Sequence, residues 1–158
     1  MSERIEKDDL IAVERYKFIL EKIKYLDSLH HAHFNFVYKI IISLASFVIA
    51  VAFLGIEGKV EIRTVIFSIK SPGLVMTSIC LFFLAMSRAI LSSWRDYRIE
   101  EVELLRSIDT KVERSMPSNG FSWRWNEVQF MLLLLVLSLV GLGLYIFPES
   151  IVELYSNK

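Results

Sequence analysis

The sequence contains a single cysteine, Cys80, which lies inside an apolar stretch. One thiol cannot form a disulfide within the chain, so no intrachain disulfide stabilises the fold. The cysteine content therefore does not indicate whether the protein lies in an oxidising or a reducing compartment. The net charge is zero, because 18 basic and 18 acidic residues are interleaved along the chain. A nucleic-acid partner would require a basic stripe, and this interleaving argues against one.

Motifs that carry catalysis are also missing. The sequence has no nucleophile elbow, no glycine-rich phosphate loop and no HExxH zinc motif. The acidic residues nearest to an acid–base set are Asp96, Glu100, Glu101 and Glu103. Arg95 and Arg98 lie beside them at helical spacing, which favours ion pairs along a helix. We therefore expect no enzyme and no cofactor.

Charge is nearly absent from three stretches, residues 40–56, 71–87 and 128–148. Each approaches or reaches the roughly 20 apolar residues that a helix needs to cross a bilayer. A soluble all-α bundle is the alternative, but its helices are rarely apolar on every face for this length. The expected fold class is therefore all-α: an integral membrane protein with three transmembrane helices.

An amphipathic helix is expected before the first span. Its apolar residues include Leu10, Val13, Phe18, Leu20 and Ile23, and its polar face carries both signs of charge. A helix lying on a membrane surface usually has a polar face rich in lysine and arginine. The mixed face favours packing on a partner helix instead.

The second span is expected to begin at Pro72 and Gly73, since proline is tolerated in a first helical turn. Residues 57–70 before it have the pattern of an amphipathic helix at the outer interface, with a short strand at 60–62 as the alternative. No breaker follows until Pro117, so the second span should continue out of the membrane as one long helix. The expected segments are 1–33 (cytoplasmic amphipathic helix), 34–55 (first span), 56–72 (external loop with an interfacial segment), 73–93 (second span), 94–126 (cytoplasmic helix and turn), 127–147 (third span) and 148–158 (external tail).

Basic residues predict the orientation. Twelve lysines and arginines lie before the first span or between the second and third, and four lie on the opposite side. Basic residues in short loops stay in the cytoplasm. The N-terminus is therefore expected inside, and the first span should remain as a signal anchor because no cleavable signal peptide precedes it.

Histidines and isolated cations are the candidate sites. His30 and His33 share a helical face and are weak candidates for metal ligands, since a site needs a third or fourth ligand; the alternative is a polar collar among lipid headgroups. Lys39 and Arg88 are expected at matched depth near the inner ends of their spans. They either snorkel to the interface or form a basic belt that binds anionic phospholipid or lines a pore.

Two further groups of residues predict helix packing and self-association. Small residues recur every fourth position on the second span, and apolar residues form a stripe on its extension. Small faces drive association between helices in lipid, and an exposed apolar stripe requires a partner surface. The residues expected at oligomer contacts are Ala85, Ala89, Ser93, Leu104, Leu105 and Ile108. For the last three, the N-terminal helix of the same chain is the alternative partner.

Residues 94–105 (WRDYRIEEVELL) and 14–20 (ERYKFIL) resemble stretches in the RipA-type family of small bacterial inner-membrane proteins. In that family a charged N-terminal helix precedes the membrane spans. The resemblance implies a homo-oligomer, an octamer, without enzymatic activity. The segment 57–70 and the histidines have no counterpart in it.

The sequence therefore favours a non-enzymatic homo-oligomer of the bacterial cytoplasmic membrane with a scaffold or pore-like role. Its expected partners are membrane lipid, other copies of the chain and a possible membrane protein, with no nucleic acid. One alternative is an accessory subunit of a transport or envelope-stress complex. A lipid-modifying membrane enzyme is a third reading, disfavoured because the apolar stretches 40–56, 71–87 and 128–148 hold no carboxylate or histidine.

Overall fold

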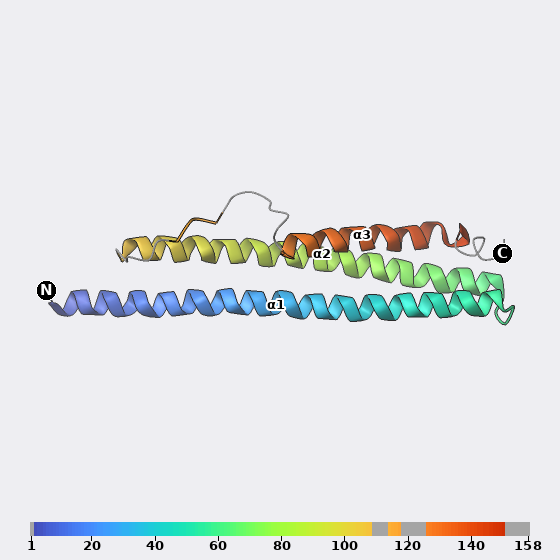
Figure 1. Ribbon diagram of the computed structural model, residues 1–158, viewed down its shortest axis with the longest axis horizontal. Coiled ribbons are helices and arrows are strands. Elements are labelled where there is room, and N and C mark those ends of the chain that lie inside the picture. Colours follow the sequence, from blue (N-terminus) through green and yellow to red (C-terminus); the bar gives the residue numbers. More distant parts are fainter. Residues whose placement is uncertain (1, 109–113, 118–125, 151–158) are drawn as a thin grey trace.

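The computed structural model describes residues 2–108, 114–117 and 126–150, with side chains from Leu10 onward. The described chain forms three helices, α1 (Ser2–Ile56), α2 (Ile62–Ser107) and α3 (Asn126–Ile146), and contains no strand (Figure 1). All three are long and apolar enough to cross a membrane. The all-α class with three candidate spans is thus confirmed, and residues 60–62 form no strand.

The N-terminal amphipathic segment and the first span form one helix, α1, of 55 residues. Neither glycine nor proline occurs before Gly55, so nothing in the sequence interrupts the backbone hydrogen bonds. The helix ends where Gly58 adopts a φ of 68°, which glycine allows without steric cost. The Lys59 amide donates to the Leu54 carbonyl and the Gly58 amide to Gly55, both at 3.1 Å, which is the Schellman pattern of a helix C-terminus.

The second helix begins earlier than expected. α2 starts at Ile62, so Pro72 lies inside the helix and does not open it, and the segment 57–70 is mostly part of the same helix. Pro72 has no N–H to donate to the Ser68 carbonyl, but one such loss is tolerated in spans packed against neighbours. Pro72 is buried in the structure.

α2 also extends well beyond its apolar stretch, as expected, and ends at Ser107, before Met116. Residues 114–117, which include Pro117, are not helical, and the rest of the expected turn, 118–120, lies outside the described residues. We call residues 10–29 of α1 and 94–107 of α2 the arm. In Figure 1 the arm continues past the start of α3.

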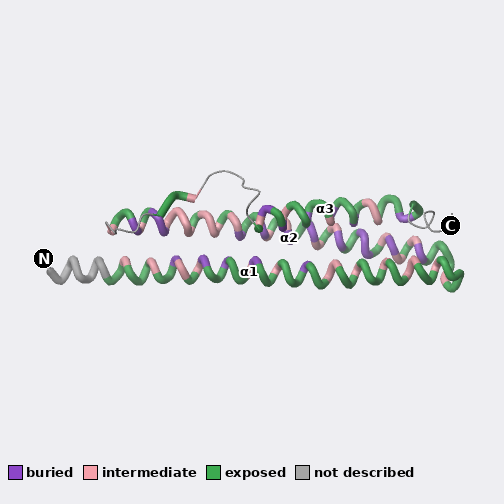
Figure 2. Tube along the Cα trace, in the orientation of Figure 1, coloured by how far each residue is buried: buried purple, intermediate pink, exposed green. Residues whose placement is uncertain are grey.

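α1 and α2 run antiparallel and pack along most of their length (Figure 1). The buried residues of α1 recur at three- and four-residue steps, Ile19, Ile23, Leu26 and His30, with Val37 one heptad further. This spacing keeps one face of a helix against its neighbour, and Figure 2 shows the buried positions on the side of α1 that faces α2. The apolar residues Leu10, Val13 and Phe18 lie elsewhere and are exposed.

α3 packs on the part of α2 that contains its apolar stretch, residues 71–87. We call the apolar parts of the three helices the membrane half. A Cβ on Gly73 would lie 2.7 Å from the Gly141 carbonyl oxygen, so the two backbones touch because neither residue has a side chain. The Thr77 hydroxyl donates to the Gly73 carbonyl at 2.9 Å and to the Ser138 carbonyl at 3.2 Å. On the arm side of this contact the three helices share one core of buried residues, Val37, Met76, Cys80, Phe83, Phe130 and Leu134.

Candidate functional site

Lys39 on α1 and Arg88 on α2 are both exposed. Neither forms an ion pair with any side chain that the structure describes. Both are therefore available to lipid or to another subunit, and the basic belt stays a prediction.

Replacing Lys39 and Arg88 together with glutamine tests this belt. If the belt binds anionic phospholipid, the double variant should retain less phosphatidylglycerol or cardiolipin after purification, because each basic residue near an anionic surface contributes about 1 kcal/mol. If it lines a pore, anion-over-cation preference in a bilayer conductance measurement should shift. Lys59→Gln with Arg63→Gln, at the other end of the spans, is the control. Unchanged lipid content and unchanged conductance would leave simple snorkelling.

The residues expected at oligomer contacts divide into two groups. Ala85 and Ala89 are exposed and Ser93 is half-buried, so neither α1 nor α3 covers this face of small residues. Leu105 is 8% exposed within a single chain, whereas Leu104 and Ile108 are half-buried. Leu105 thus needs no second subunit to be buried.

The arm contains a buried carboxylate that ties three parts of the chain together. The side chain of Glu101 is 0% exposed. Arg98 donates to its Oε2 at 2.8 Å, and Arg114, from the segment after α2, donates to its Oε1 at 2.6 Å. The Tyr16 hydroxyl of α1 lies 3.5 Å from the same Oε1. A buried charge needs partners of this kind.

A second ion pair lies next to this network at the surface. Arg15 of α1 binds Glu100 of α2, with the Arg15 Nε donating at 2.9 Å. The sequence predicted ion pairs along one helix, and the Arg98–Glu101 pair within α2 is of this kind. Glu100 and Glu101 also contact Arg15 and Tyr16 of α1, which the sequence did not predict. Glu101 occupies a stripe position between Tyr97 and Leu105, and that position is the sequence signal of a buried carboxylate.

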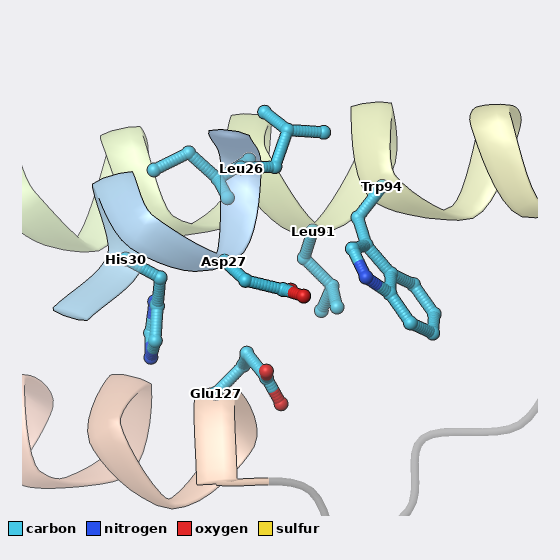
Figure 3. A pocket seen from close by; sticks show the side chains of 7 residues that line it. Leu26, Asp27, His30, Leu91, Trp94 and Glu127 are labelled. Atoms are coloured by element: carbon cyan, nitrogen blue, oxygen red, sulfur yellow. The ribbon is translucent and has the colours of Figure 1, made fainter. Parts of the chain in front are cut away.

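A pocket of about 190 Å³ lies where the arm meets the membrane half of the three helices. Its lining comes from all three: Leu26, Asp27 and His30 of α1, Ile90, Leu91 and Trp94 of α2, and Glu127 of α3. In Figure 3 the His30 ring points from α1 toward α3, Asp27 points sideways in the direction of Leu91 and Trp94, and Glu127 rises from the start of α3. Sequence reasoning did not identify Asp27 and Glu127 as site residues.

His30 is the buried polar group of this pocket. It is 7% exposed, and its Nδ1 has no hydrogen-bond partner among the described residues. Its ring packs edge-on against Phe130 with centroids 5.3 Å apart. His33 packs against Phe83 at 5.1 Å and does not line the pocket.

In the part of the chain that the structure describes, no three histidine, cysteine, aspartate or glutamate side chains are placed to hold a metal ion. The chemistry of the pocket is instead two carboxylates, one imidazole and a wall of apolar side chains. Such a lining suits a small cationic group with hydrogen-bond donors.

Comparison with known proteins found no matching family model, no matching curated protein and no matching solved structure.

Proposed function

We propose that the protein is a non-enzymatic scaffold of the membrane that assembles into a homo-oligomer through the outer face of α1. The observation that carries this proposal is a line of exposed apolar side chains on the arm. Ile11, Phe18 and Tyr25 are 53%, 50% and 58% exposed. They recur every seven residues, a spacing that places them on one line of an α-helix.

The membrane cannot cover this line. α1 is one continuous helix of 55 residues, which corresponds to about 80 Å, whereas the hydrocarbon core is about 30 Å thick. Figure 1 shows α1 as a straight rod, so with residues 40–56 in the bilayer the arm projects away from it. The apolar line therefore faces water unless a protein covers it.

A second copy of the chain is the partner that fits best. Helices with a seven-residue apolar repeat pack on helices with the same repeat. A second copy of this chain carries the same repeat, so a homo-oligomer needs no other protein to cover the line. Ala85 and Ala89 are exposed on α2 and offer a second contact inside the membrane. The subunit number, eight, rests on the resemblance to the RipA-type family.

The proposed location is the bacterial cytoplasmic membrane with the arm in the cytoplasm. Support comes from the basic residues, twelve of which lie on the arm side of the spans against four on the other. A pore-like assembly is included in this proposal, and the Lys39 and Arg88 variant tests it.

Serine at Ile11, Phe18 and Tyr25 should convert the oligomer into single chains in mild detergent. All three side chains are exposed, so the subunit fold should persist while the apolar contact is lost. Native mass spectrometry gives the subunit number, and circular dichroism checks the helical content.

Serine at Glu14, Lys17 and Glu21, three exposed polar positions of the same helix, is the matched control and should leave the mass unchanged. A wild-type protein that purifies as a single chain would contradict self-assembly. If one copy of the wild-type chain purifies together with another membrane protein, the accessory-subunit alternative would replace the homo-oligomer.

A further inference from the structure

We propose that the pocket between Asp27, His30 and Glu127 binds the headgroup of an aminophospholipid. The inference is independent of the oligomer, because one chain supplies the whole pocket. Its starting point is that neither Asp27 nor Glu127 forms an ion pair with any described residue. Two carboxylates that line one pocket without a cation attract a ligand that carries one.

The imidazole of His30 is the second, independent observation. It lines the pocket, more than nine-tenths of it is buried, and its Nδ1 lacks a hydrogen-bond partner among the described residues. A buried polar atom without a partner costs free energy. The imidazole is therefore a polar group in the pocket wall whose Nδ1 no described residue satisfies.

A more open depression adjoins the pocket at His30. It measures about 380 Å³ and is lined by His30, His31, Phe34, Asn126, Gln129, Phe130 and Leu133. Phe130 and Leu133 belong to the apolar stretch of α3, so this depression leads from the polar pocket toward the hydrocarbon. Asn126 and His31 add side chains that can donate hydrogen bonds near its entrance.

An aminophospholipid matches this order of surfaces. Its primary ammonium supplies three N–H donors for the carboxylates of Asp27 and Glu127. Its phosphate would lie near the imidazole and amide donors of His30 and Asn126, and its acyl chains along Phe34 and Leu133. The pocket, at about 190 Å³, is large enough for the four heavy atoms of an ethanolamine group.

Other headgroups fit less well. An anionic headgroup such as glycerol phosphate would meet two carboxylates of the same charge sign. A choline headgroup carries its charge on a nitrogen with three methyl groups, which cannot donate hydrogen bonds to those carboxylates. Selectivity for a primary ammonium is therefore the property to measure.

The test titrates the purified full-length protein in detergent with phosphatidylethanolamine, phosphatidylcholine and phosphatidylglycerol of the same acyl chains. Bound lipid is counted by native mass spectrometry. We expect phosphatidylethanolamine to bind at least tenfold more tightly than the other two, about 1.4 kcal/mol. Asp27→Asn with Glu127→Gln should abolish this preference.

Asp96→Asn with Glu103→Gln, which changes two exposed carboxylates outside the pocket, should keep the preference. Circular dichroism confirms that both double variants are folded. Equal binding of the three lipids, or an unchanged preference in the Asp27 and Glu127 variant, would overturn the proposal. Displacement of the lipid by millimolar free ethanolamine would also overturn it, since the site would then recognise a soluble amine.

Discussion

Methionine in place of both Arg98 and Arg114 should lower the melting temperature in detergent by on the order of 10 °C. The change leaves the carboxylate of Glu101, which is fully buried, with the Tyr16 hydroxyl as its one remaining partner among the described residues. Removing the partners of a buried charge costs about 3–5 kcal/mol, and about 2–4 °C of melting temperature accompanies each kcal/mol in a chain of this size. Circular dichroism during heating measures the effect.

A third substitution shows whether the buried charge is the cause. Glu101→Leu added to the double variant should recover most of the lost stability, because it removes the carboxylate that was left without partners. Arg15→Met breaks the ion pair with Glu100. The Arg15 and Glu100 side chains are 62% and 34% exposed, so the loss should cost no more than about 1 kcal/mol. A double variant no less stable than Arg15→Met would contradict the tie that Glu101 makes between α1, α2 and the segment after it.

Leucine at Gly141 should separate α3 from α2. A Cβ at this position would lie 2.7 Å from the Thr77 hydroxyl and 2.8 Å from the Gly73 carbonyl oxygen. The carbonyl belongs to a helix backbone and cannot rotate away, so the helices must move apart and lose their packed contact. We expect a cost of about 3 kcal/mol, seen as a lower melting temperature in detergent.

Gly143 provides the matched control for this substitution. It lies two residues further along the same helix, and a Cβ there would meet no atom within 4 Å. Gly143→Leu should therefore leave the free energy of unfolding within about 0.5 kcal/mol of wild type, as surface substitutions usually do, and the melting temperature nearly unchanged. Equal destabilisation by both leucines would show that α3 packs on α2 through another face.

The Glu101 network and the pocket at His30 both involve α1 and α2, the first within the arm and the second at its base, where α3 also contributes. α1 is continuous from the arm through the membrane half, so a contact made on the arm and a ligand bound at its base act on the same rigid helix. The arm is thus positioned both by its internal ion pairs and by its connection to the span.

The helical class and the three spans follow from the sequence alone, because long apolar stretches without charge have one stable form in a bilayer. The N-terminal helix and the first span were expected as separate segments, and the structure joins them in α1, which the absence of glycine and proline before Gly55 permits. The sequence also placed Pro72 at a helix start. Local propensity disfavours proline inside a helix, and the packing of Pro72 and Gly73 in the membrane half overrides that preference.

Which face of each helix is used was decided only by the tertiary structure. The sequence shows apolar residues on several sides of α1, and the contact with α2 selects Ile19, Ile23 and Leu26 while Phe18 stays exposed. Asp27, Trp94 and Glu127 are up to 100 residues apart in the chain and converge because each lies at the arm end of a different span. Periodicity describes one helix at a time, so a pocket built from three helices, and a carboxylate buried between them, arise only when the helices pack.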